Sequence, residues 1–173
     1  MFWRGVALWV AATLLSGCVT ERSGFDYAAM MQKVGPPRAG LARIVVLQEK
    51  ITEVGATVCD IKLDGETVGR LRPGTYLYAD RPAGRHQLQA TETLFPGESK
   101  RDITTESGRT YFFLARTSDR HKAVTGLTIL GGLAGAVVAS AATAASENPG
   151  PVDLLPLNET AARTTIAELQ LAE

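Results

Sequence analysis

The chain has 173 residues, enough for one ordinary domain together with targeting and connecting segments. Its 18 Lys and Arg balance 18 Asp and Glu, so the net basic charge typical of nucleic-acid-binding proteins is absent and no nucleic-acid partner is expected. Two Cys and two His are too few for a disulfide-dense mini-protein or a His-rich metal site, and no metal or other cofactor is predicted.

Residues 1–17 have the organisation of an export signal. Arg4 gives the start a positive charge, an uncharged apolar stretch occupies residues 6–15, and two small residues precede Cys18. The ten residues of this stretch, at roughly 1.5 Å each, cover only about half of a ~30 Å hydrocarbon core, which is too short for a stable membrane span. We expect residues 1–17 to be a signal peptide that directs the chain into the cell envelope.

The end of this segment, Leu15-Ser16-Gly17-Cys18, resembles the lipobox of bacterial lipoproteins. The resemblance implies transfer of a diacylglyceryl group to the Cys18 thiol, cleavage before Cys18, and acylation of the new amino terminus by a fatty acid such as palmitate. Several acyl chains, at about 0.8 kcal/mol per buried CH₂, would hold the protein on a membrane, so membrane lipid is the first expected partner. The alternative is an ordinary signal peptide with a chance cysteine.

The residue after the cysteine bears on the choice of membrane. Val19 stands where an Asp would resemble an inner-membrane retention signal. We therefore expect a lipid-anchored protein that faces the periplasm, with the outer membrane favoured over the inner membrane. Cleavage would leave Cys59 as the only free thiol, so no disulfide is expected within the mature chain.

Residues 18–41 have the composition of a tether. Ser, Gly and the Gly35-Pro36-Pro37 break favour a soluble, irregular segment. A tether requires only such solubility and sufficient length. A short apolar patch at residues 28–31 is available to pack on a neighbouring surface.

Residues 42–118 are predicted to form a small antiparallel β-sandwich, which makes the fold class mainly β. Short strand patterns alternate with Gly, Pro and Asp turns, and no helical period separates them. The expected strands are 43–47, 57–63, 67–71, 75–79, 85–90, 100–105 and 110–114. The first and the last are apolar on both faces, which is typical of a strand covered on both sides. A small barrel is the alternative.

A tight hairpin turn is expected at Asp64-Gly65, because this dipeptide readily adopts the positive φ angles that such a turn needs. Gly69 and Gly84 are expected to hold further turns. His86 follows soon after Gly84, and a bond between one of its ring nitrogens and a nearby carbonyl would be a sufficient role for it.

The runs LDGETVG at residues 63–69 and PAGRHQL at residues 82–88 resemble the pattern of PEGA-type β-domains, in which DG-x-x-VG is followed by PG-x-H-x-L. They most resemble an uncharacterised domain family of bacterial lipoproteins built on that pattern. The resemblance covers about residues 42–116 and implies a small β-sandwich in the cell envelope, with no established activity. The sequence departs from the pattern at Ala83, which separates the proline from the glycine.

Residues 119–146 are predicted to be a Gly/Ala-rich apolar helical segment. Its charge-free part, residues 123–145, has 23 residues and is long enough to cross a bilayer. It contains only seven large aliphatic residues among eight Ala, four Gly and four Ser or Thr, however, which gives about −2 to −4 kcal/mol towards insertion. Gly131 and Gly135 would allow another helix to approach closely.

The charges on either side of this segment argue against a simple span. Arg116, Arg120 and Lys122 precede it and acidic residues follow it, which opposes the positive-inside preference for a chain whose domain lies outside the cytosol. We favour a helix or helical hairpin that packs on its own domain, on another copy or at the membrane surface. Arg120 and Lys122 would then either contact anionic lipid headgroups or form a solvated charge run.

The C-terminal part is predicted to be a Pro-rich connector over residues 147–157, followed by a helix over residues 158–173. The first residue of that helix is an Asn, which is suited to capping it. Ala162, Ile166 and Leu169 share one face and form a narrow apolar stripe that needs a surface to dock on.

No residue pattern points to catalysis. Cys59 and His86 are the one pair that could join a thiol with a base, but each falls on the apolar face of its strand, where a structural role is favoured. His121 lies in a basic cluster and is expected to be solvated. The sequence contains no nucleophile elbow, no phosphate-binding Gly-rich loop and no zinc-binding HExxH motif.

We therefore expect a protein that is not an enzyme but a lipid-anchored, non-catalytic binding or assembly module of the cell envelope. Its protein partner would be another copy or another envelope protein. Two alternatives stay open: a bitopic or oligomeric membrane protein that uses residues 123–145, and an envelope enzyme whose carboxylate site the sequence does not reveal.

Overall fold

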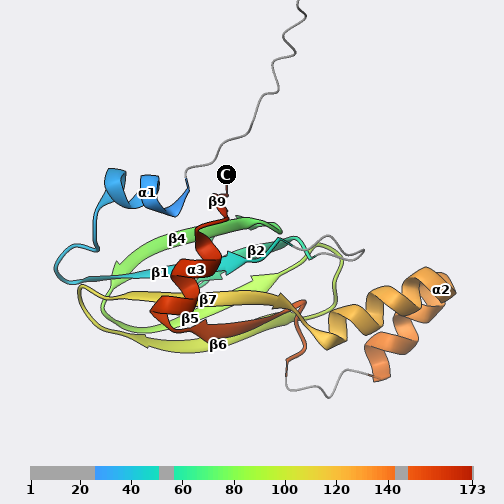
Figure 1. The fold of residues 1–173 in the computed structure, drawn as a ribbon. Coiled ribbons are helices and arrows are strands. Elements are labelled where there is room, and N and C mark those ends of the chain that lie inside the picture. Colours follow the sequence, from blue (N-terminus) through green and yellow to red (C-terminus); the bar gives the residue numbers. More distant parts are fainter. Residues whose placement is uncertain (1–25, 51–56, 143–147, 173) are drawn as a thin grey trace, which may run out of the picture.

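The computed structural model describes residues 26–50, 57–142 and 148–172, so the predicted signal peptide and Cys18 lie outside the described residues. Within these ranges the fold is mainly β, with two packed sheets and three helices (Figure 1). All seven strands expected between residues 42 and 118 are present, each within a few residues of its predicted bounds. The sheets do not close into a barrel.

Two sheets of unequal size make up the β-structure. The larger has the strand order β8-β7-β1-β4-β9, and the smaller has the order β3-β2-β5-β6. The strands of the larger sheet are β1 (Leu41–Gln48), β4 (Thr75–Pro82), β7 (Thr110–Thr117), β8 (Val152–Leu157) and β9 (Gln170–Leu171). Those of the smaller sheet are β2 (Cys59–Leu63), β3 (Glu66–Leu71), β5 (Gly84–Thr91) and β6 (Glu98–Thr105).

The predicted antiparallel arrangement is confirmed for the smaller sheet but only in part for the larger sheet. Its β1–β7 and β4–β9 pairs are parallel, while its other two pairs are antiparallel. Parallel neighbours need a long crossover connection, and here the chain builds the whole smaller sheet between β1 and β7. Such long-range order leaves no trace in the local alternation of apolar and polar residues.

Two short helices cover the outer face of the larger sheet, α1 (Tyr27–Val34) and α3 (Glu159–Ile166), so β1 is covered on both faces as its apolar run predicted. One apolar core lies between the two sheets and a second lies under the helices. The first includes Ile44, Val46, Cys59, Ile61, Leu63, Leu77, Leu88 and Phe113. The second includes Tyr27, Met30, Val45, Leu47, Tyr76, Phe112, Ala162, Ile166 and Leu169.

Helix α1 falls inside the predicted tether 18–41, so part of that segment is folded. Asp26 caps the helix at its start. At its end the fully buried Arg43 donates to the carbonyl of Gly35 at 2.7 Å. The same guanidinium donates to both carboxylate oxygens of Asp80 on β4, at 2.7 and 2.8 Å, and so joins the helix to two strands.

The predicted connector over residues 147–157 is wrong for its second half, because β8 is a strand that pairs antiparallel with β7. Val152 and Leu154 are buried and alternate with partly exposed neighbours. Pro156 is tolerated because β8 is an edge strand of its sheet, where proline is least disruptive. The prolines concealed an ordinary alternating strand pattern.

The predicted C-terminal helix is shorter than residues 158–173, because α3 ends at Ile166. Asn158 caps it, and the stripe of Ala162, Ile166 and Leu169 is buried as predicted. The chain then becomes extended as β9, which pairs with β4. This pairing uses backbone groups that a longer helix would have bonded internally, and it therefore competes with the last helical turns.

The Gly/Ala-rich segment forms α2 (Asp119–Ala142), which is a helical hairpin rather than one helix. Gly132 has φ 58° and ψ −148°, a conformation far from helical and open essentially only to glycine. We call residues 119–131 the first arm and residues 133–142 the second arm. In Figure 1 the hairpin, in orange, projects beyond one end of the two sheets.

Candidate functional site

The predicted turn at Asp64-Gly65 joins β2 to β3. The two residues have φ angles of 55° and 83°, and positive values at both positions are what a type I′ turn requires. The Asp64 carboxylate accepts the Gln87 backbone N–H at 2.8 Å, and its other oxygen lies 2.7 Å from Nδ1 of His86. The turn therefore places an acidic side chain against β5.

His86 links this turn to the corner where the chain passes from one sheet to the other. Its Nε2 atom lies 2.8 Å from the carbonyl oxygen of Pro82, and its Nδ1 atom faces Asp64. Because carbonyls and carboxylates only accept, both bonds form together when both ring nitrogens carry a proton. Burial alone would raise the pKa of Asp64, but the bonds from Gln87 and His86 outweigh burial and lower that pKa below 3.8. Because its two ring nitrogens lie within hydrogen-bond distance of Asp64 and of the Pro82 carbonyl, His86 has a structural role.

The other two predicted turn glycines, Gly69 and Gly84, differ in position. Gly84, with φ of 151°, follows Ala83 at the corner between the larger and the smaller sheet. Gly69 is not in a turn, which corrects its prediction; it lies within β3, opposite Ile61 and beside a shift in register. A Cβ at this position would come within 3.0 Å of the Leu77 side chain, so glycine allows the strand to pack closely.

A second polar cluster lies where α2 joins the β-structure. We call it the hairpin base: Glu92, Phe95, Arg120 and His121. Arg120 is only 8% exposed, donates to the carbonyls of Pro96 and Pro149, and has its guanidinium carbon 5.2 Å from the centroid of the Phe95 ring. A buried side chain bonded to backbone carbonyls neither contacts lipid headgroups nor belongs to a solvated charge run, so both alternatives predicted for Arg120 are wrong.

His121 is buried as well, so the expectation that it is solvated is wrong. Its Nε2 atom lies 2.9 Å from Oε2 of Glu92, and its ring stacks on Phe95 with centroids 5.1 Å apart. Burial raises the pKa of Glu92, and the charge and hydrogen bond of His121 partly offset that rise. The contacts of Glu92 and Phe95 with α2 were not predicted, because these two residues lie in a loop far from α2 along the chain. Lys122, in contrast, is exposed and pairs with Asp119 at 3.1 Å.

The residues that follow the hairpin segment, 148–152, lie beside the end of β7 and the start of α2. Ser118 Oγ donates to the carbonyl of Gly150 at 2.7 Å, and Ser99 Oγ donates to that of Val152 at 2.5 Å. A Cβ on Gly150 would lie 2.0 Å from the backbone nitrogen of Ser99, so only glycine fits there. Thr117 and Val152, which flank the hairpin, are direct partners in the β7–β8 pair. The two ends of the hairpin segment are therefore held side by side.

The large side chains of the first arm become more exposed from its base to its tip. The exposed fraction is 7% for Val124, 41% for Leu127, 67% for Ile129 and 86% for Leu130. The outermost aliphatic side chains of this arm consequently have little cover from the protein.

The break at Gly132 bears on two predictions. Gly131 and Gly135 lie on different arms, so they do not form a close-approach surface on one helix as predicted. In the part of the chain that the structure describes, no helix is both long and apolar enough to cross a membrane.

The thiol considered as a nucleophile is inaccessible. Cys59 is fully buried, and burial raises its pKa to about 12. It lies at the opposite end of the β2–β5 pair from His86, so the two side chains do not act together. Across residues 26–50, 57–142 and 148–172, no group of three or more His, Cys, Asp and Glu side chains is arranged to hold a metal ion.

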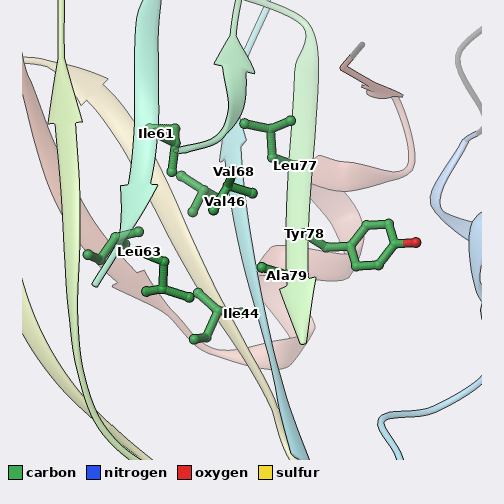
Figure 2. Close-up of a pocket in the computed structure, with 9 residues that line it drawn as sticks. Ile44, Val46, Ile61, Leu63, Val68, Leu77, Tyr78 and Ala79 are labelled. Atoms are coloured by element: carbon green, nitrogen blue, oxygen red, sulfur yellow. The ribbon is translucent and has the colours of Figure 1, made fainter. Parts of the chain in front are cut away.

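Figure 2 shows a void in the core between the sheets. Ile61 and Leu63 of the smaller sheet face Ile44 and Val46 of the larger sheet across it, while the ring of Tyr78 points away. Its volume is about 10 Å³, close to the minimum for one water molecule, and its lining is apolar. This void is too small for a ligand.

Comparison with known proteins places the chain in a family without assigning an activity. No curated protein matches it. A family model described as "Protein of unknown function (DUF2846)" matches residues 38–127, which run from just before β1 into the first arm of α2 and make up just over half of the chain. The chain therefore belongs to this family of proteins of unknown function.

Proposed function

We propose that the protein is a lipid-anchored component of the bacterial cell envelope, attached through acylated Cys18 and facing the periplasm, with the outer membrane favoured. The observation that carries this proposal is the run Leu15-Ser16-Gly17-Cys18 at the end of an export signal. A thiol preceded by small residues meets the needs of diacylglyceryl transfer and signal cleavage. The acyl chains would then supply the attachment.

Within the envelope we assign the β-structure, taken as a PEGA-like β-sandwich, a non-catalytic role in binding or assembly. Three side chains that could have carried chemistry support this assignment, because each is buried or hydrogen-bonded within the fold. Both ring nitrogens of His86 lie within hydrogen-bond distance of other groups of the fold, the Cys59 thiol is buried, and His121 is buried against Glu92. The protein partner in this proposal is another copy or another envelope protein.

The Cys18→Ser variant tests the anchor. We expect the wild-type protein in the membrane fraction, with a mature amino terminus whose mass is that of acylated Cys18, and we expect the variant to lose both the added mass and the attachment. Cys59→Ala is the matched control, because it removes the other thiol of the chain and should retain both properties. A wild-type protein that kept residues 1–17 or carried no lipid would contradict the proposal.

A further inference from the structure

The helical hairpin is charged at its base and apolar towards its tip. Asp119, Arg120 and Lys122 all lie in the first turn of the first arm, and residues 123–142 carry no charge. A helix that packs on its own domain through one face normally shows one apolar stripe, whereas a helix that is apolar all round is typical of an apolar environment. Here the hairpin is charged at its base and uncharged towards its tip, so the tip is the part suited to enter an apolar environment.

The arms have the length of one leaflet rather than of a whole bilayer. The uncharged part of the first arm has nine residues (123–131) and the second arm has ten (133–142). At 1.5 Å per residue these parts are about 14 and 15 Å long, roughly half of a ~30 Å hydrocarbon core.

The fold also places the two ends of the hairpin segment on the same side, next to each other. Thr117 and Val152 are paired residues of β7 and β8, and Ser118 bonds to the carbonyl of Gly150. A single span through the hairpin segment would carry these ends to opposite faces of the membrane and would break the β7–β8 pair. A segment that enters and leaves on the same side satisfies the strand pairing.

We infer that α2 is a re-entrant hairpin whose tip, including Leu127, Ile129 and Leu130, inserts among the acyl chains of the near leaflet. The inference rests on the proposed anchorage at Cys18, which holds the hairpin close to lipid. The exposed charges of Asp119 and Lys122 would remain at the level of the headgroups. A second copy packed along the arms would cover a lengthwise stripe, whereas the observed exposure increases towards the tip.

A depth measurement on the acylated full-length protein tests the inference. A fluorophore is attached at Leu130→Cys in the tip and, in a separate sample, at Leu94→Cys, which replaces a leucine that is 99% exposed in the loop between β5 and β6. The buried thiol of Cys59 and the lipid-blocked thiol of Cys18 should not react. In phosphatidylethanolamine and phosphatidylglycerol vesicles with spin-labelled acyl chains, we expect at least threefold stronger quenching at position 130 than at position 94.

The possible results separate the inference from the proposed function. Equally weak quenching at both positions, in protein that is attached to the vesicles, would overturn the inference and leave the anchor standing. Protein that fails to attach would overturn the anchorage proposal and the inference with it. A disulfide between two copies of unlabelled Leu130→Cys protein treated with a mild oxidant, together with weak quenching of the labelled protein, would show that a second copy covers the tip and would also overturn the inference. Near-UV circular dichroism checks that both labelled variants are folded.

Discussion

At the scale of single residues, two arginines form similar ion pairs in very different surroundings. Arg43 is fully buried and bonds both carboxylate oxygens of Asp80, while Arg70 is exposed and bonds both oxygens of Asp60 at 2.8 and 3.3 Å. Breaking a buried pair leaves a charge with little water around it, whereas an exposed pair exchanges easily with solvent. The two pairs therefore differ in their contribution to stability.

We expect Arg43→Met to lower the free energy of unfolding by about 3 kcal/mol, because it leaves the Asp80 carboxylate and the Gly35 carbonyl without their donor. Arg70→Met is the matched control and should cost much less. Urea denaturation followed by circular dichroism measures both losses. Losses of similar size would show that burial of Arg43 is not what makes its pair important.

Asp64 should make a pH-dependent contribution to the free energy of unfolding. Burial acts to raise its pKa, but the bonds from Gln87 and His86 lower it below 3.8. A carboxyl group whose pKa is lower in the folded state stabilises the fold above its unfolded pKa of about 4, and this stability disappears as the pH falls through the folded value. We expect Asp64→Asn to cost about 1 kcal/mol at pH 5, since the carboxylate is partly exposed, and the difference to shrink towards pH 2.

Urea denaturation at several pH values measures this difference. Asn tolerates a positive φ, so the variant should keep the turn. Asp119→Asn is the control, because it removes the same formal charge from a side chain that is 99% exposed. A difference between wild type and Asp64→Asn that grew as the pH fell would contradict the assigned role of the carboxylate.

At the scale of elements, the shape of α2 depends on Gly132. We expect Gly132→Ala to strain the break by about 1–3 kcal/mol and to shift the hairpin towards a continuous helix. Spin labels at Ala123→Cys and Ala141→Cys would be about 27 Å apart in a continuous helix, and they should be closer in the wild-type background. Double electron–electron resonance measures the distance.

Gly126→Ala is the matched control for that measurement. Gly126 is also a glycine of α2 with open space around it, but it lies within the first arm rather than at the break. Its substitution should leave the distance between the labels unchanged. A wild-type distance already near that of a continuous helix would show that α2 is not a hairpin.

The strands of residues 42–118 were predictable because each carries its own turn signals and apolar pattern. The apolar residues on both faces of β1 also indicated that both faces are covered. β8 was missed because prolines obscured the alternation of Val152 and Leu154. β9 has only two residues, so it depends on backbone bonds to its neighbours and carries no pattern. The parallel pairing of β1 with β7 depends on contacts between distant segments, which local patterns do not contain.

The polar clusters also divide into one that local sequence predicts and one that depends on contacts between distant segments. Asp64, Gly65 and His86 were predictable because a turn and a spacing within two neighbouring strands define them. The hairpin base could not be predicted, because the burial of Arg120 and His121 depends on a loop and a C-terminal segment that meet only in the folded chain. In isolation these two residues have the sequence signature of a solvated basic cluster.

At the scale of the whole molecule, the larger sheet connects every part of the described chain. Its inner face packs on the smaller sheet and its outer face carries α1 and α3, while β7 and β8 lead into and out of the hairpin. The elements after the hairpin thus complete the same sheet that the elements before it began. The β-structure and the hairpin form one folded unit joined at two points.

The parallel β1–β7 pair has a consequence for orientation. Because β1 and β7 are parallel, the start of β1 and the end of β7, where the hairpin leaves, lie at opposite ends of the sheet (Figure 1). The chain does not enter the fold at the start of β1, however: Tyr27, the first residue of α1, packs edge-on against Tyr76, which pairs with Leu47 near the other end of β1. Helix α1 therefore brings the tether back towards the end of the sheet that carries the hairpin. An anchor at Cys18 and a hairpin inserted tip first would then reach the same membrane surface, and two such attachments would restrict rotation of the β-structure about either one.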